Sequence, residues 1–367
     1  KLSGFAPATI TSLTRDLIEK HLIMEKTVRN TDNRGRPAIA LCVSPIYWQS
    51  LCATLMEDRF EITLSELNGV IVKQKIFPLS TNKLSTLDEF LVSSIEQFLN
   101  KTKELSNLIT FSVIVGGELD KDGNLIKLGS QKFNQLNLRT LFSPYFPILI
   151  SEYFKTWLLA ESTLGNAINC DDALFIQLDD EVNFNVLSEG NILFNREHER
   201  ININHLVVPR LNELQALINR DLPEIERYQV QHQITHRAII QLIDLLYPNN
   251  HFSTNAEKIK FFCRNIIQQE KTALRILDHL TDCLAYILMN LLHIFSAEKI
   301  MLNSSMLIVK DVLLEELNQK LTTYFSHGKV VEVVMGKYEW NSPVVAAAAI
   351  KQGIYDGTLL TNLEQPE

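Results

Sequence analysis

Arg34 and Arg36 flank Gly35 and precede Pro37, so two cations are held close together in a polar stretch of the chain. An Arg-Gly-Arg turn is flat and narrow enough to enter an A·T-rich minor groove, where the negative potential attracts both guanidinium groups. A solvated basic turn would use the same residues. Because this turn lies between two short apolar segments, directly after an amphipathic helix, we favour the DNA-binding interpretation.

The preceding helix, expected over residues 6–22, offers a second set of residues suited to DNA. Small and hydroxyl side chains allow close entry into a major groove, and an arginine can reach phosphates or base edges. An ordinary solvated helix face is the alternative. The candidate DNA-contacting residues on this helix are Ala8, Thr9, Thr11, Ser12 and Arg15.

Other chemistry-bearing residues form weaker patterns. His232 and His236 are spaced i, i+4 on an expected helix and could share a metal ion, but no third ligand is near, so we interpret them as solvated or hydrogen-bonded. Acidic clusters at 171–172 and 179–181 fall at strand boundaries and are assigned no catalysis. The five cysteines are scattered without a Cys-x-x-Cys pair, which predicts reduced packing residues and no zinc ribbon.

The basic turn is positioned by three expected elements at the front of the chain. Pro7 suits the first turn of a helix, and apolar residues recur at helical spacing after it. Short strands over 22–26 and 38–42 follow, separated by the polar turn. Helix, strand, turn and strand form the back half of a winged helix-turn-helix, and we expect its first helices to be missing from this sequence.

The rest of the chain predicts an α/β fold in which hairpins alternate with crossovers. Three consecutive antiparallel strands are expected first, and one long helix ending near Phe295 is expected late in the chain. After Pro209 the chain turns helical. The strands are expected at 51–56, 61–67, 70–77, 109–115, 173–178, 182–187, 192–194, 299–302 and 330–335, and the helices at 86–103, 154–164, 273–295, up to about 324, and from 344.

Length, composition and charge limit the class of protein. With 367 residues, 46% hydrophobic and 21% charged, the chain suits a soluble protein of two or three domains. The net charge of −8 by itself argues against a nucleic-acid partner, because a polyanion repels a protein that is negative overall. Residues 1–43 differ, because seven basic and four acidic side chains give them +3 and leave −11 for the remainder. No stretch is apolar enough to span a bilayer and no secretory signal is present, so we expect a cytoplasmic protein.

Several motifs together resemble the ROK (repressor, open reading frame, kinase) family of regulators and sugar kinases. The front segments occur in the same order and spacing as in the winged helix of ROK repressors, and the likeness continues across nearly the whole chain. The segments that carry it are residues 6–11, 17–22 and 33–38, Gly117-Glu118-Leu119-Asp120 with Gly123, residues 157–161 with Gly165, Ser188-Glu189-Gly190, residues 346–349 and residues 355–360.

This resemblance implies a partial winged helix-turn-helix followed by a two-lobed actin-like, ribonuclease-H-like ROK domain. We expect a DNA-binding domain over 1–43, a small lobe over 44–155 against which a C-terminal helix at 343–367 packs, and a large dimerisation lobe over 156–342. The family also implies a homodimer that binds double-stranded operator DNA through paired winged helices.

The same resemblance shows which kinase chemistry is missing. ROK kinases use an aspartate as the base that deprotonates a sugar hydroxyl, and alignment on Trp157 places Tyr153 at that position with Glu152 before it. A phenol with an ordinary pKa near ~10 is a poor base at neutral pH. Glu152 could replace the aspartate only if the strand shifted by one residue. We therefore expect no enzyme and no catalytic residue.

The family's ligand and zinc motifs are degenerate as well. Its Gly-x-Gly turn falls at residues 183–185, where asparagines occupy the glycine positions. Its Glu-x-Gly-His motif reads Asn202-Ile203-Asn204-His205, so only the histidine remains. The zinc cysteines expected soon afterwards are replaced by residues 208–213, and a lone histidine cannot hold structural zinc. We expect no metal and no cofactor, and a degenerate pocket at Glu152, Tyr153, Asn202 and His205.

The sequence therefore predicts a transcriptional repressor of sugar-related or other metabolic genes, with a non-catalytic ROK domain that serves as dimerisation and effector module. Its signal could be a small-molecule effector, a phosphotransferase-system protein, or nothing at all. Two alternatives remain: a ROK sugar kinase with an N-terminal appendage, and a protein-interaction scaffold that has stopped binding DNA.

Overall fold

The computed structural model describes residues 6–28, 38–44, 47–66, 70–101, 107–129, 131–142, 148–193, 201–252, 254–304, 306–324 and 331–338, together with Ser342, Val344, Val345, Ala348 and Ile350. The chain divides into two compact units, residues 1–160 with 341–367 and residues 161–340. Within the described residues each unit has its own five-stranded sheet and its own hydrophobic core.

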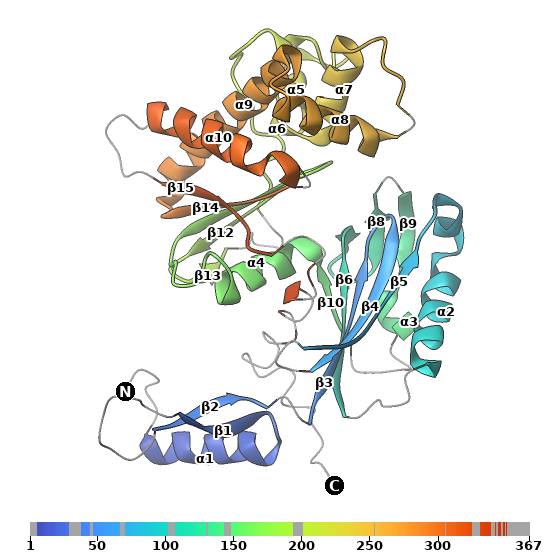
Figure 1. Cartoon of the computed structure of the whole chain (residues 1–367), viewed down its shortest axis with the longest axis vertical. Coiled ribbons are helices and arrows are strands. Elements are labelled where there is room, and N and C mark those ends of the chain that lie inside the picture. Colours follow the sequence, from blue (N-terminus) through green and yellow to red (C-terminus); the bar gives the residue numbers. More distant parts are fainter. Residues whose placement is uncertain are drawn as a thin grey trace. The chain divides into compact units, whose positions relative to one another are not determined.

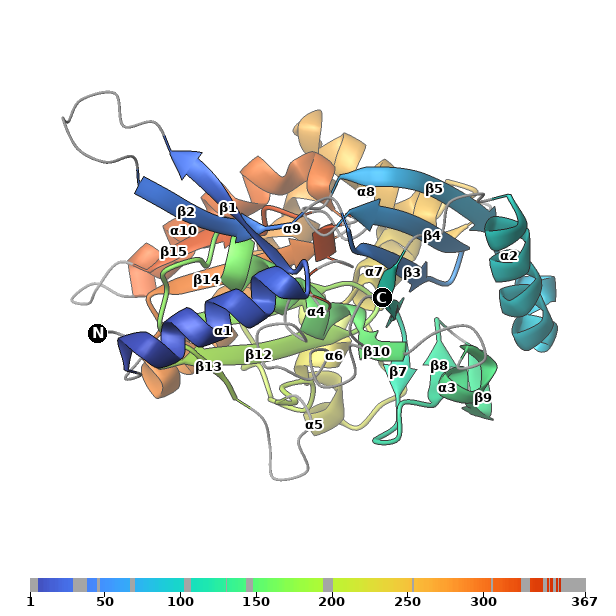
Figure 2. The same ribbon diagram turned by 90° about the horizontal axis from the view of Figure 1, so that it is seen from below.

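The front of the chain forms helix α1 (Pro7–Glu19) and an antiparallel hairpin of β1 (Ile23–Val28) and β2 (Ala38–Val43), which lie side by side in Figures 1 and 2. This arrangement confirms the expected helix and the two strands that follow it, while the turn expected between the strands lies outside the described residues. Pro7 starts the helix, where its missing N–H costs no hydrogen bond. No described residue of α1 is fully buried.

The sheet of the first unit has the strand order β10-β6-β3-β4-β5. The antiparallel run β3-β4-β5 confirms the three consecutive strands expected from the sequence, while β6 and β10 add parallel strands on the other side of β3. Helices α2 and α3 lie on one face of this sheet (Figure 1), where their apolar side chains join those of the strands in one core. The elements are β3 (Gln49–Leu55), β4 (Arg59–Glu66), β5 (Ile71–Pro78), η1 (Thr81–Thr86), α2 (Leu87–Asn100), β6 (Leu108–Val115), α3 (Leu138–Phe142) and β10 (Ile148–Glu152).

A small antiparallel sheet of β7 (Glu118–Leu119), β8 (Leu125–Leu128) and β9 (Gln131–Leu136) was not anticipated from the sequence. Gly117 precedes it, and a Cβ at this position would lie 2.2 Å from the carbonyl oxygen of Lys127. A glycine is therefore required where the two backbones meet.

The second unit has a sheet of order β13-β12-β11-β14-β15. Strand β11 is antiparallel to β12 and parallel to β14, and β15 extends the parallel part. Helix α10 lies on one face of this sheet in Figure 1, and α4 leads into the unit. Helix α4 (Tyr153–Leu164) begins in the first unit and ends in the second. The other elements in this part of the second unit are β11 (Ala173–Leu178), β12 (Val182–Ser188), β13 (Asn191–Ile192), β14 (Lys299–Ser304), η3 (Leu307–Val309), α10 (Lys310–Tyr324) and β15 (Glu332–Met335).

The long helix expected from the apolar stripe is α9 (Lys271–Phe295), whose stripe is buried in the core of the second unit. Glu270 caps it by accepting hydrogen bonds from the backbone N–H groups of Thr272 and Ala273. None of the helices, as far as they are described, is long and apolar enough to cross a membrane. The remaining helical elements are η2 (Leu214–Ala216), α5 (Glu224–Arg227), α6 (Val230–Gln233), α7 (His236–Leu246) and α8 (Asn255–Ile267).

Candidate functional site

The candidate DNA-contacting residues of α1 are all exposed and share one side of the helix. Positions three and four apart on a helix are neighbours, so Ala8, Ser12 and Arg15 form a row with Thr11 beside it. The hydroxyl of Thr11 donates to the carbonyl of Pro7 at 3.0 Å, which holds this side chain against the helix. Thr9 lies at the edge of the row. These five positions of α1 carry small or hydroxyl side chains and one arginine, and none of them is a carboxylate.

The opposite side of α1 carries the apolar residues of the amphipathic pattern. Leu17 and Ile18 are partly buried, whereas Ile10 and Leu13 remain 40% and 48% exposed. The helix therefore presents its polar row and part of its apolar row to the surface, and it is anchored mainly through its C-terminal half.

The hairpin after α1 is continuous up to its last described pair, Val28↔Ala38. Nine residues, 29–37, connect these two positions and lie outside the described residues, and the candidate residues Arg34, Gly35 and Arg36 are among them. The described ladder therefore ends at Val28 and Ala38, the two residues that flank this segment in the chain.

Glu152 and Tyr153 lie where β10 ends and α4 begins. The Glu152 carboxylate accepts the backbone N–H of Leu119 at 3.2 Å, and its own carbonyl accepts the hydroxyl of Thr156 at 3.0 Å. Tyr153 is 4% exposed. The Glu152 carboxylate is thus bonded to backbone, and the next position carries a buried phenol.

Residues 183–185 lie in the middle of β12 and not in a turn. Asn183 donates from its side chain to Gln177 of the neighbouring β11 at 3.2 Å, and Asn185 is buried with its side-chain oxygen accepting the N–H of Val186. Side chains and regular strand pairing occupy these positions, which is not the geometry of an open glycine turn.

Asn202 and His205 belong to an irregular segment, and both are exposed. The Asn202 side chain accepts the backbone N–H of Asn204, which forms a local turn. Nδ1 of His205 lies 3.2 Å from the amide oxygen of Gln229 and 3.4 Å from the amide nitrogen of Gln231. The neighbours of His205 are therefore amides, not thiolates.

The expectation that His232 and His236 share one helix is wrong. The chain breaks between α6 and α7, because Thr235 is in an extended conformation before the first residue of α7. Nε2 of His236 lies 3.8 Å from Oδ1 of Asp179, and its backbone N–H donates to the carbonyl of the same residue. Burial lowers the pKa of His232 from its ordinary value. The two histidines thus serve different contacts.

A hydrogen-bonded turn occupies the segment that follows His205. Gln215, 0% exposed, accepts the backbone N–H groups of Leu211 and Asn212 through its side-chain oxygen and donates to the carbonyl of Pro209 at 2.9 Å. One buried amide therefore satisfies three backbone groups of an irregular segment.

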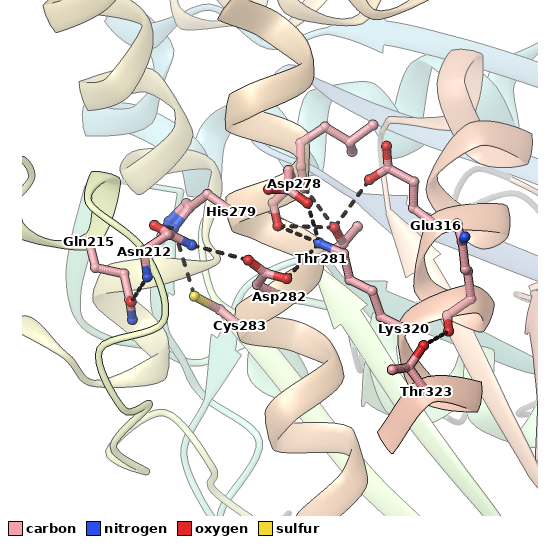
Figure 3. A network of polar contacts seen from close by, with 12 residues as sticks. Asn212, Gln215, Asp278, His279, Thr281, Asp282, Cys283, Glu316, Lys320 and Thr323 are labelled. Atoms are coloured by element: carbon pink, nitrogen blue, oxygen red, sulfur yellow. Dashed lines mark hydrogen bonds and ion pairs between the residues drawn. The ribbon is translucent and has the colours of Figure 1, made fainter. Parts of the chain in front are cut away.

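Figure 3 shows how this turn is tied to α9. The amide oxygen of Asn212 lies 3.1 Å from Nδ1 of His279, whose Nε2 lies 3.1 Å from the carbonyl oxygen of Gln233. His279 is 1% exposed, and burial lowers its pKa to about 4, so the ring is neutral at neutral pH. Cys283, one turn further along α9, lies 3.8 Å from the same imidazole. We found no sequence signal for this contact, because Asn212 and His279 are far apart in the chain.

The other side of the network joins α9 to α10. The Lys320 ammonium lies 2.6 Å from a carboxylate oxygen of Asp278 and 2.7 Å from one of Asp282, and Thr281 donates to Glu316 at 3.2 Å (Figure 3). Although partial burial disfavours its charged form, the two carboxylates raise the pKa of Lys320. The arrangement pairs charges between two helices and leaves no open cation to bind a ligand anion.

The described residues contain no group of three or more histidine, cysteine, aspartate or glutamate side chains that could hold a metal ion. All five cysteines are free, and burial raises the pKa of Cys52 to about 12 and that of Cys263 to about 11. Such thiols are poor nucleophiles and poor metal ligands at neutral pH.

Comparison with curated proteins finds full-length relatives among transcriptional regulators. The chain is 22% identical to the DNA-binding transcriptional repressor Mlc of Escherichia coli (strain K12), over 100% of this chain and 91% of that protein. It is 23% identical to the DNA-binding transcriptional dual regulator NagC of the same strain, over 98% of this chain and 89% of that protein. No family model matches.

Comparison with solved structures places the same fold in regulators and kinases. A ROK family transcriptional regulator described as a homologue of E. coli Mlc matches with a TM-score of 0.77 at 22% identity, over 98% of this chain and 91% of that one. A ROK hexokinase from Thermus thermophilus matches with a TM-score of 0.64 at 13% identity, over 84% of this chain and all of that one. The fold is therefore the one shared by these two kinds of protein.

Proposed function

The chain is a homologue of the ROK-family regulators Mlc and NagC along its whole length, and from this premise we propose that it is a DNA-binding transcriptional regulator acting as a repressor. The observation that carries the proposal is the exposed row of α1, followed by the regular antiparallel pair of β1 and β2. The sequence Arg34-Gly35-Arg36 falls between these two strands in the chain, outside the described residues. The row would enter the major groove and the turn the adjacent minor groove.

Charge distribution supports this division of labour. Residues 1–43 carry a formal +3, whereas the rest of the chain carries −11. A polyanion is attracted to the first segment and repelled by the remainder, so DNA contact is confined to the helix and hairpin. Residues 1–43 form the DNA-binding part of the proposal, residues 44–155 the small lobe, and residues 156–342 the large lobe, which joins two protomers into a homodimer.

The two lobes act as dimerisation and effector module without catalysis. At the strand end where a ROK kinase has its aspartate, this chain has a buried phenol and a carboxylate bonded to the backbone of Leu119. The signal that controls DNA binding is then a small molecule recognised without the usual carboxylates, or a protein such as a phosphotransferase-system component, and the regulated genes are sugar-related or other metabolic genes.

Genome-wide selection of DNA bound by the purified full chain tests the proposal. We expect an enriched set of fragments with A·T-rich flanks, and we expect Arg34→Ala/Arg36→Ala to weaken binding and reduce that flank preference. The matched control is Lys121→Ala/Lys132→Ala, which removes two exposed cations of the small lobe and should leave both unchanged. Unaltered affinity and preference in the arginine variant would show that the wing is not in the groove. If the wild-type chain enriches no fragment at low salt, the protein-interaction scaffold is favoured instead.

A second candidate function is sugar phosphorylation, because several solved neighbours with this fold are named as sugar kinases. We expect no ATP-dependent phosphorylation of any hexose, since a phenol replaces the catalytic carboxylate. A coupled assay for ADP over a panel of hexoses checks this. Turnover that depends on Tyr153 or Glu152 would favour the kinase over the regulator.

A further inference from the structure

The C-terminal end of α1 makes a compact junction with the residues that lead into β3. Lys20 caps the helix, and His21 follows with a φ of +55°, a left-handed conformation that reverses the chain. The backbone N–H of Leu22 then bonds to the carbonyl of Leu17, and Leu22 is 2% exposed. Backbone hydrogen bonds therefore fix the conformation of the chain between the end of α1 and the start of β1.

Two aromatic residues from the entry to β3 pack onto this helix end. The indole N–H of Trp48 donates to the carbonyl of Lys20 at 2.7 Å, and Trp48 is 8% exposed. The ring of Tyr47 stacks on that of His21 with 4.5 Å between centroids and meets Trp48 edge-on at 5.2 Å. The backbone N–H of Ser44 completes the junction by donating to Leu22 at 2.9 Å.

These contacts give the helix and hairpin a second connection to the small lobe. The covalent connection is the one chain segment between β2 and β3, and the contacts of Tyr47 and Trp48 add non-covalent links to it. Carbonyls in the last turn of a helix lack intrahelical partners, so the Trp48 indole also satisfies a group that would otherwise need water. The aromatic stack and the Trp48 hydrogen bond join the C-terminal end of α1 to the residues that precede β3, the central strand of the sheet of the first unit.

We propose that Tyr47 and Trp48 are positioning residues that hold α1 and its hairpin at a fixed orientation on the small lobe, and so set the spacing of the two DNA half-sites that a dimer can bind together. This inference rests on the proposed function. The role proposed for Tyr47 and Trp48 requires no contact with DNA. They act through the geometry of α1, and the benefit of binding two half-sites at once depends on that geometry.

The test compares a single half-site with paired half-sites, both taken from DNA selected by the wild-type chain. The test variant is His21→Asn/Trp48→Phe. Asparagine accepts the left-handed conformation but cannot stack as an aromatic ring, and phenylalanine keeps the packing of Trp48 but removes the N–H donor. Tyr47→Phe, which keeps the stacking ring, is the matched control.

For the wild-type chain and for Tyr47→Phe we expect paired sites to bind more tightly than single sites, and a 5-bp insertion, about half a helical turn, to weaken paired binding by roughly tenfold or more. For His21→Asn/Trp48→Phe we expect single-site affinity within about twofold of wild type, paired-site affinity about tenfold weaker, and a much smaller effect of the insertion.

The outcomes separate this inference from the function beneath it. If the wild-type chain binds neither DNA, the proposed function fails. If the wild-type chain binds and the double variant keeps the full advantage of paired sites and the full insertion effect, the junction does not position the helix. Loss of single-site binding in the double variant would also overturn the inference, because the junction would then stabilise α1 itself.

Discussion

His279 is a buried base inside a mostly polar network, and its protonation state links pH to stability. Burial lowers its pKa from 6.5 to about 4, although Asp278 and Asp282 lie near and favour the proton, while Lys320 opposes it. Between these two pH values the unfolded chain binds a proton that the folded chain does not. The free energy of unfolding therefore falls as the pH drops from about 6.5 towards 4, by about 3 kcal/mol in total.

We expect His279→Gln to be less stable than the wild-type chain at pH 7 and to lose less stability between pH 6.5 and 4. Urea unfolding at several pH values measures this difference. The control is His293→Gln, which removes an exposed histidine of the same helix and is measured over the same pH series. A wild-type and a His279→Gln profile that run parallel would show that the proton enters elsewhere.

At the scale of an element, the irregular segment 209–215 depends on Gln215. Replacement by leucine leaves the N–H groups of Leu211 and Asn212 and the carbonyl of Pro209 without their amide partner. A fully buried group without a partner costs about 1–3 kcal/mol, and these backbone groups are only partly buried, so we expect Gln215→Leu to lower the free energy of unfolding by about 2 kcal/mol. The exposed Gln319 on α10, changed to leucine, is the control and should have little effect.

In ROK proteins the same segment carries zinc-binding cysteines, and this chain has none of them there. Gln215, Asn212 and His279 hold the segment through hydrogen bonds, so we expect a chelator to leave the unfolding midpoint of the wild-type chain unchanged, as followed by circular dichroism. Stoichiometric zinc in the purified protein, or a lower midpoint with chelator, would show that this interpretation of the segment is wrong.

Elements with a strong local pattern could be predicted from the sequence, and elements without one could not. The apolar stripe placed α9 within two residues of its start, and the order of α1, β1 and β2 followed from Pro7, helical spacing and a polar turn. Strands β7 and β8 are short and β9 is mostly exposed, so none of the three has a clear alternation of apolar and polar residues. The break between α6 and α7 was missed because Thr235 turns its hydroxyl to the carbonyl of Gln231 and not to the helix it precedes.

Contacts between residues distant in sequence were the part that no pattern signalled. The pairing of Asn212 with His279 and of Trp48 with Lys20 depends on how elements pack, which composition and periodicity do not encode. By contrast, the helical period predicted that Ala8, Thr11, Ser12 and Arg15 share one side of α1, although it did not predict that Ile10 and Leu13 of the apolar row are exposed as well.

At the scale of the whole molecule, a net charge of −8 has to be reconciled with a polyanionic partner. Only residues 1–43 are net positive, and each phosphate that they neutralise releases counterions from the duplex. If two protomers bind together, the slope of log affinity against log salt should be about twice as steep for paired half-sites as for one. The acidic remainder makes approach to DNA in any other orientation unfavourable, and more so at low salt.

We expect Arg34→Ala/Arg36→Ala to reduce the steepness of that slope by about 1–2 for each protomer bound, whereas Lys121→Ala/Lys132→Ala should leave it unchanged although it removes the same formal charge. Fluorescence anisotropy over a salt series measures both. Equal loss of slope in the two variants would mean that DNA senses the total charge of the protein and not a cationic tip. A selective loss in the arginine variant would mean that binding depends on where the cations lie, which is why a net-acidic chain can hold DNA at one end.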